Sequence, residues 1–320
     1  MFAALVRALV VLTVMAAAPA KADNYPSRNV ELIVPFAAGG GTDLLARLMS
    51  EGLGKQLNQS FIPLNRPGAN TNTGTLQAVK SAPDGYTLVM ASIGLAANPS
   101  LYKRLAFNPL TDLEPITLIA NSPTVLVVPP SFPANNLQEF ITLMKARPGE
   151  FNYASYGIGS GPHLATELFR FKAGVDIVHV PYTGGGPAAV GVMGNSVQML
   201  FSSILPVLGL VRGGQLKAIA LASDKRSPLL PDVPTFAESG VDYRTGTWFG
   251  LLAPAKTPKP IIDTLHASSI AVLQEPAVRA RIAEQGADVV ANTPDEFRAF
   301  LKEEMERLAV VIRNAKMSLD

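Results

Sequence analysis

The feature that most constrains this fold is a unit that recurs along the chain. Each copy contains an apolar segment of strand type, a glycine-rich turn, and apolar residues at helical spacing. The copies occupy residues 32–49, 151–171 and 177–194. Strands that alternate with helices predict an α/β chain with a mostly parallel sheet. Open sheets of this kind bind ligands beyond the carboxyl ends of their strands, which is where these turns lie.

The rest of the pattern favours the same fold class. The segment 114–130 suits two strands, or one long strand broken near Ser122. Thr257 is the expected N-cap of one helix, and Thr293 begins a capping box that Glu296 completes. We expect further strands over residues 85–92, 196–203, 216–223 and 247–255, and helices over residues 137–149, 256–273 and 292–315.

The glycine turns offer a chemistry that needs no charged side chain. A helix start leaves about four backbone N–H groups without partners, and the helix dipole places partial positive charge there. Glycine lets another group approach that backbone closely, so such a turn can bind an anion. Residues 37–42 form one turn, and residues 155–163 form a second that adds the Ser155 and Ser160 hydroxyls. Two facing turns of this kind predict a carboxylate held from both sides.

Plainer interpretations stand beside this one. A single glycine turn often only connects a strand to a helix, whereas three on βα units favour a binding function. Asp43 either complements the dipole of its helix or orients the glycine loop or a bound water. His163 lies at a helix start, where it can donate a hydrogen bond to a ligand, and we expect His179 to be packed within a strand.

Enzyme motifs do not fit these turns. A phosphate-binding P-loop needs a lysine where Asp43 stands, and a dinucleotide-binding turn needs a glycine where Pro162 stands. The G-x-S-x-G elbow of serine hydrolases fails at both Ser92 and Ser160. The chain has no cysteine, and its histidines lack the spacing of metal ligands, so we expect no metal and no cofactor. His163 beside Ser160 leaves a hydrolase as an alternative of another class.

The amino-terminal segment predicts export. Residues 1–22 combine Arg7, an apolar run and a small-x-small end at Ala20–Ala22, which is typical of a signal peptide cleaved before Asp23. A membrane anchor is the alternative, but the apolar run 8–18 is short against the ~20 residues of a span. An exported chain without cysteine suits a bacterial periplasm. The net charge of +2 gives no case for nucleic acid or an anionic membrane.

Several motifs follow one another through nearly the whole exported chain. They are "YPSRNVELIVPFAAGGGTDLLAR", "NRPGA", "APDGYTLVMAS", "NPSLY", "NYASYGIGSGPHLATELF", "VHVPYTGGGPAA", "VPTFAESG" and "LLAPAKTP". In this order and combination the chain resembles the Bug-type extracytoplasmic solute receptors, the substrate-binding proteins of tripartite tricarboxylate transporters. The resemblance implies an α/β fold of the two-lobed type II periplasmic binding protein class, with mixed, mostly parallel sheets joined by two hinge strands. It places lobe one at residues 23–124 and 247–320, and lobe two at residues 125–246.

The resemblance also implies where a ligand lies. In this family a carboxylate is pinched between the loop after the first strand and a glycine/serine loop of lobe two, largely through backbone amides and ordered waters. Here those loops are residues 36–43 and 155–163, with Phe36 as an apolar wall. The implied ligand-binding residues are Phe36, Ala37, Ala38, Gly39, Gly40, Gly41, Thr42, Asp43, Ser92, Asn98, Ser155, Gly157, Gly159, Ser160, His163, Tyr182, Thr183, Gly184 and Ser202.

Departures from the family pattern bear on the ligand. Many relatives carry an aspartate where this chain has Ser202, and its loss disfavours ligands with an amino group. A glycine pair is replaced by the more polar stretch 70–73, which adds possible contacts. A usual aspartate is Gly191 here, which indicates a local structural change.

We therefore expect a periplasmic solute receptor without catalysis. Its predicted ligand is a small organic acid: a dicarboxylate, a tricarboxylate, an acidic amino acid or an aromatic acid. Its predicted partners are the membrane permease subunits of a tripartite tricarboxylate transporter, and we expect a monomer. A carboxylate sensor that hands its closed form to a signalling protein is the alternative that the sequence does not separate from transport.

Overall fold

The computed structural model describes residues 25–39 and 41–319. The expected signal peptide and Gly40 lie outside the described residues. The first half of the chain forms β1 (Val30–Val34), α1 (Gly41–Leu57), β2 (Phe61–Asn65), the 3₁₀ turn η2 (Ala69–Thr71), α2 (Asn72–Val79), β3 (Thr87–Ser92), α3 (Ile93–Leu101), β4 (Leu113–Val128), α4 (Leu137–Ala146), β5 (Asn152–Ser155) and α5 (Gly161–Ala173).

The second half continues the alternation and then becomes mainly helical. It forms β6 (Val178–Pro181), α6 (Gly185–Met193), β7 (Met199–Ser203), α7 (Leu205–Arg212), β8 (Lys217–Leu221), β9 (Gly246–Pro254), α8 (Lys259–Gln274), α9 (Pro276–Glu284), β10 (Asp288–Val289) and α10 (Pro294–Asn314). No helix among these described elements is long and apolar enough to cross a membrane.

The strands form a mixed sheet in the order β2-β1-β3-β9-β4-β7-β5-β6, with β8 and β10 also paired to β4. β1 is parallel to both β2 and β3, and β5 is parallel to both β6 and β7. The pairings of β4 and β9 are antiparallel. The predicted α/β class is therefore confirmed, with antiparallel pairing confined to the strands that link the two parallel groups.

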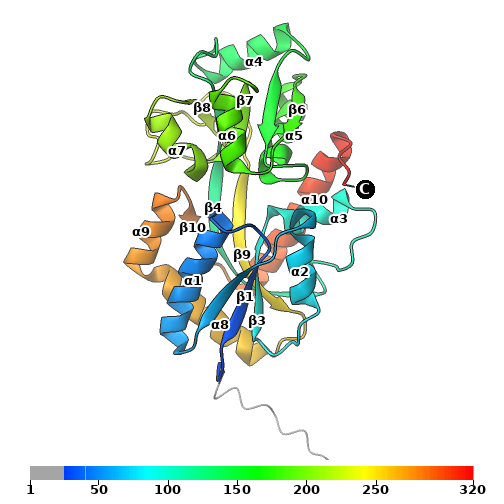
Figure 1. Cartoon of the computed structure of the whole chain (residues 1–320), viewed down its shortest axis with the longest axis vertical. Helices are drawn as coiled ribbons and strands as arrows, with labels where there is room; N and C mark the ends of the chain where they lie inside the picture. Colours follow the sequence, from blue (N-terminus) through cyan, green and yellow to red (C-terminus); the bar gives the residue numbers. More distant parts are fainter. Residues whose placement is uncertain (1–24, 40, 320) are drawn as a thin grey trace, which may run out of the picture.

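The chain divides into two bodies joined by β4 and β9 (Figure 1). β4 is one strand of 16 residues, so the long-strand alternative is the correct one. Its residues up to Pro123 pair with β9, whereas its residues from Thr124 onward pair with β7 and β8. We propose that this change of partner marks the boundary between the predicted lobes. β9 re-enters the lower body at Gly246, so both connections run through long strands.

Each body has its own apolar core. In lobe one, β1 is almost wholly buried between α1 and α8 on one side and the cluster around Trp248 and Phe297 on the other. In lobe two, aromatic side chains around Phe169 and Phe201 fill the space beneath α4 and α5. α10 begins at the predicted capping box, because Thr293 Oγ1 accepts from Glu296 N–H and the Glu296 carboxylate accepts from Thr293 N–H. α10 thus closes lobe one with its apolar stripe inward.

Several boundaries differ from expectation for identifiable reasons. α8 begins at Lys259 with Pro258 as its N-cap, because the hydroxyl of Thr257 donates to Pro254 O instead of capping the helix. The sequence pattern also did not predict β2, α2, α3, α7, α9 and β10, which are short or interrupted by glycine and proline. Of these, α3 matters most, since it lies next to the predicted ligand loops.

Candidate functional site

The two predicted ligand loops converge on one strand. A methyl group at Gly41, the first residue of α1, would lie 3.9 Å from Phe249 Cζ. One at Gly161, the first residue of α5, would lie 3.0 Å from Thr247 Oγ1 and 3.6 Å from Ile93 Cγ2. Thr247 and Phe249 are two residues apart on β9, so their side chains leave the same face with Cα atoms about 7 Å apart. The starts of α1 and α5 therefore meet over one face of β9, one from each lobe.

Asp43 fixes the shape of the first loop. Its side chain is 4% exposed, and Oδ2 accepts hydrogen bonds from Gly39 N–H at 2.9 Å and Arg47 Nε at 3.0 Å. Oδ1 accepts from Asn65 Nδ2 at 2.8 Å, and the same nitrogen lies 3.1 Å from Phe36 O. Of the two interpretations of Asp43, these contacts support orientation of the glycine loop. Asn65, at the end of β2, helps to orient this carboxylate, and the sequence pattern did not reveal it.

Asp43 stays ionised in this setting. Burial by itself would raise the pKa of its carboxyl, but the hydrogen bonds from Arg47, Gly39 N–H and Asn65 outweigh it and lower the pKa. The guanidinium of Arg47 is in turn held by this carboxylate. The charges of Asp43 and Arg47 are therefore paired with each other. The first loop offers a ligand its backbone N–H groups and not an unpaired side-chain charge.

The second loop is held by a pair of stacked histidines. Ser155 Oγ lies 2.6 Å from His179 Nε2, and it accepts from Gly157 N–H at 3.1 Å. His163 Nδ1 accepts from Gly159 N–H at 3.1 Å. The two imidazole rings stack with their centroids 3.9 Å apart, and His179 also stacks on Tyr153. The predicted packing of His179 is present, and it serves the loop through Ser155.

Both histidines are neutral near pH 7. Burial, together with the neighbouring His179 and Arg170, lowers the pKa of His163 to about 3. Burial also lowers the pKa of His179, against the opposing effect of the Glu167 carboxylate. Because Nδ1 of His163 accepts from Gly159, its proton is assigned to Nε2. His163 can thus donate from Nε2, as the sequence predicted, but only as a neutral imidazole.

Backbone N–H groups in the loops divide into used and unused donors. Gly39, Gly157 and Gly159 donate to side chains of their own loops, and Ser160 N–H donates to Gly157 O. Among the described residues, other N–H groups of the loops and helix starts make no hydrogen bond: those of Ala37, Ala38, Thr42, Ile158, Gly161 and His163. These N–H groups are the donors available to an anion. Gly161 is the one glycine among them, since Gly39, Gly157 and Gly159 already donate within their loops.

The third predicted unit brings two tyrosines beside α6. A methyl group at Gly185 would lie 3.2 Å from Tyr156 Cζ, and one at Gly191 would lie 2.6 Å from Tyr182 Cζ. Glycine at position 191 thus leaves room for the Tyr182 ring, which is the local change that the sequence indicated. Thr183 is exposed, and Gly184 is the N-cap of α6 with a φ of 150°.

Ser202 contacts the second ligand loop through a hydrogen bond to Tyr156. It is fully buried, its Oγ lies 2.5 Å from Tyr156 Oη, and it donates to Ser203 O at 2.7 Å. Burial raises the pKa of the Tyr156 hydroxyl to about 12, so the pair is neutral. Tyr156 directly follows the predicted Ser155 and was missed because an aromatic after a strand carries no motif. Two uncharged hydroxyls therefore occupy this position.

Ser92 and Asn98 lie on the lobe-one side. Ser92 is the N-cap of α3 and is 3% exposed, and no side-chain capping bond is present at this position. Asn98 is fully buried and bonds to the η2 segment, with Nδ2 2.7 Å from Asn70 O and 2.6 Å from Asn72 Oδ1. Asn98 therefore supports the segment beside the loops and does not line an open surface.

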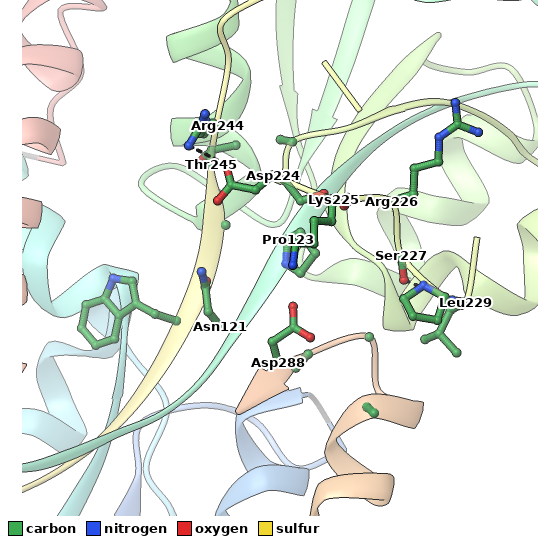
Figure 2. Close-up of a pocket in the computed structure, with 18 of the residues that line it drawn as sticks. Asn121, Pro123, Asp224, Lys225, Arg226, Ser227, Leu229, Arg244, Thr245 and Asp288 are labelled. Atoms are coloured by element: carbon green, nitrogen blue, oxygen red, sulfur yellow. Dashed lines mark hydrogen bonds and ion pairs between the residues drawn. The ribbon is translucent and has the colours of Figure 1, made fainter. Parts of the chain in front are cut away.

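A separate cavity of about 1010 Å³ lies along the hinge strands (Figure 2). Asn121, Pro123 and Asp288 line it from lobe one and β4, and the segment 222–229 lines it from lobe two. None of the predicted ligand-binding residues line it. Its charged groups include the ion pair of Arg244 with Asp224 and that of Arg307 with Glu304. It lies between the two bodies, beside the connecting strands β4 and β9.

Comparison with known proteins decides the family. The model of the tripartite tricarboxylate transporter family receptor matches residues 45–317. The chain belongs to this receptor family. The protein BugT of Bordetella pertussis is 40% identical over 306 residues, which are 95% of this chain and 94% of BugT. The resemblance inferred from the motifs is therefore confirmed.

Solved members of the family share the fold. An adipate-bound protein of R. palustris is 33% identical, with a TM-score of 0.85 over 92% of this chain and 99% of the other. MatC from Rhodopseudomonas palustris, with bound malate, is 32% identical, with a TM-score of 0.81 over 90% of this chain and 100% of the other. The structural neighbours of this receptor are periplasmic binding proteins, which confirms the predicted fold class.

Proposed function

We propose that this receptor binds a small organic carboxylate between the loop 36–43 and the loop 155–163. The observation that carries the proposal is the meeting of two helix starts over Thr247 and Phe249, each with unused N–H donors. A carboxylate buried without hydrogen bonds would cost several kcal/mol, so donors from both lobes are needed. The ligands of the neighbours, adipate and malate, belong to the same chemical class.

Binding from both sides gives a reason for closure. A ligand that contacts both lobes makes all its hydrogen bonds only when the lobes are together, so it shifts the population toward the closed arrangement. We propose that the receptor acts in the periplasm as a monomer and delivers its ligand to the permease subunits of a tripartite tricarboxylate transporter. A sensor that presents the same closed form to a signalling protein is the second candidate.

A hydrolase that uses Ser160 and His163 is disfavoured by the contacts of these two residues. Ser160 Oγ donates to Gly157 O at 2.6 Å, and His163 Nδ1 is occupied by Gly159 N–H. The described residues therefore show no nucleophile–base hydrogen bond at this pair, which catalysis of that kind requires. We propose a receptor without turnover, and NMR of bound malate over many hours should show no product.

Calorimetry and thermal unfolding with matched ligands test the binding proposal. Adipate and malate are compared with adipamide, which has the length of adipate without its charge, and with 1,6-diaminohexane. A ligand at about 100 times its Kd should add roughly 2.7 kcal/mol of stability. Stabilisation by a dicarboxylate but by neither control supports the proposal. Equal stabilisation by adipamide, or binding of the diamine alone, would refute the backbone-anion account.

Uptake measurements separate transport from sensing. A strain that lacks this receptor should lose uptake of the stabilising acid, and the gene supplied in trans should restore it. Unchanged uptake together with a lost transcriptional response to the acid would favour the sensor instead.

A further inference from the structure

A strained segment of lobe one stands beside the second ligand loop. Ala69, Asn70 and Thr71 have φ values of 45°, 48° and 79°, although none of them is glycine. Positive φ is costly for alanine and for β-branched threonine, and asparagine tolerates it best. Such strain persists only where neighbouring contacts impose it, and it concentrates at ligand clamps and switch regions.

Asn98 holds residues 69–71 in this conformation through its side-chain amide. Its Nδ2 group donates to Asn70 O at 2.7 Å and to Asn72 Oδ1 at 2.6 Å, and its Oδ1 accepts from Asn70 Nδ2 at 2.8 Å. Thr75 Oγ1 also donates to Thr71 O at 2.9 Å. All of these contacts lie within lobe one, so the segment keeps its shape independently of lobe two.

The donor count fixes which way the Asn70 amide faces. Both N–H bonds of Asn98 Nδ2 are used, so Asn98 presents its oxygen to Asn70, and Asn70 must present its nitrogen. One hydrogen of Asn70 Nδ2 is thereby used, and one remains. The carbonyl oxygen of Gly159, in the second loop of lobe two, lies 3.5 Å from this nitrogen.

In lobe two, the absence of a side chain at Gly159 leaves room for the Asn70 amide to approach. Gly159 has a φ of 77°, and a methyl group there would lie 2.8 Å from Asn70 Nδ2 and 2.6 Å from Leu101 Cδ1. Leu319 lies close to the same point and is tied to lobe one, because its N–H donates to Leu101 O at 3.0 Å. Apolar side chains thus flank the Asn70–Gly159 contact, which strengthens a hydrogen bond formed there.

We propose that Asn70 is a positioning residue that stabilises the closed arrangement of the two lobes. Its amide donates to the Gly159 carbonyl, while Asn98 and the strained segment hold it ready in lobe one. A separation of 3.5 Å is long for this bond, whose usual length is about 2.9 Å, so a small further approach of the lobes completes it. The inference rests on the proposed function, because closure matters only if a ligand is enclosed.

Asn70→Gly tests the proposal without straining the chain. Glycine accepts a φ of 48° readily, so the variant removes the amide and should keep the fold. Asn72→Ala is the matched control, since it also removes a hydrogen bond to Asn98 but does not reach lobe two. Because the chain has no cysteine, spin labels at Lys80→Cys and Lys145→Cys, both exposed, can report the distance between lobes by pulsed EPR.

The ratio of short to long label distances should fall about two- to tenfold in Asn70→Gly, the range expected for one hydrogen bond. The control should keep the wild-type ratio, and Asn70→Gly should release adipate faster by a similar factor. Identical distance distributions for wild type and Asn70→Gly, or an equal shift in Asn72→Ala, would overturn the proposal. The measurement without ligand decides this even if no dicarboxylate binds, so the two proposals fail separately.

Discussion

Asp43→Asn tests whether the first loop must be held in shape by the Asp43 carboxylate in order to bind its ligand. The carboxylate has two oxygens that accept from Gly39 N–H, Arg47 Nε and Asn65 Nδ2. An asparagine keeps one acceptor and turns an NH₂ group toward at least one of these donors. One hydrogen bond to a charged group is then lost outright, which costs about 1.5–3 kcal/mol.

If the ligand binds only when the loop has its wild-type shape, the free energy of this lost hydrogen bond lowers the binding affinity. The same energy corresponds to adipate binding weakened about 10- to 150-fold. Urea unfolding measures the stability change, and isothermal calorimetry measures the affinity change. Arg47→Ala is the control. It removes a partner of the same carboxylate, but the Arg47 side chain is itself 52% exposed. We expect its effect on both quantities to be much the smaller.

Asp43→Asn and Arg47→Ala can give two results that the proposed role of this loop does not allow. If Asp43→Asn binds adipate as tightly as wild type while its stability falls, the carboxylate supports the fold and the loop needs no ordering by it. If Arg47→Ala weakens binding as strongly as Asp43→Asn, the guanidinium itself acts on the ligand. The first result would contradict the view that Asp43 orders the loop for binding, and the second would contradict the view that the loop binds through its backbone alone.

Three further outcomes follow from the geometry. Gly39→Ala should lower the free energy of unfolding by about 1–2 kcal/mol through its positive φ alone, whereas Gly41→Ala should be nearly neutral; urea unfolding of both decides. Gly191→Ala should displace the Tyr182 ring and change ligand affinity with little loss of stability, and unchanged affinity would place Tyr182 away from the ligand. The pKa of His163 falls from 6.5 to about 3 on folding, so the unfolded chain binds the extra proton. The stability of wild type relative to His163→Gln should therefore be full above pH 6.5 and decline as the pH falls toward 3, as measured by thermal unfolding.

The fold was largely predictable because its strongest signals are local. Strand, glycine turn and helix follow one another within single short segments, so each unit can be recognised without its neighbours. α3 escaped because Gly94 and Pro99 interrupt its apolar pattern, although it packs against α10. The long β4 was ambiguous because Pro123 usually interrupts a strand, and here it stands where the strand changes partners.

The site was predictable only as far as its chemistry is local. The glycine turns indicate exposed donors, but which donors stay free depends on residues distant in the chain. Ser155 is oriented by His179, and Asp43 is oriented by Asn65, and no spacing in the sequence connects these pairs. The consequence is chemical. Arg47 is already paired, and the described contacts place no free cation on either loop, so under the proposed function the selectivity for an anion comes from oriented peptide groups. We propose that selectivity among anions then depends on neutral side chains such as Tyr156, which Ser202 holds in place, and that these favour a ligand end without an ammonium group.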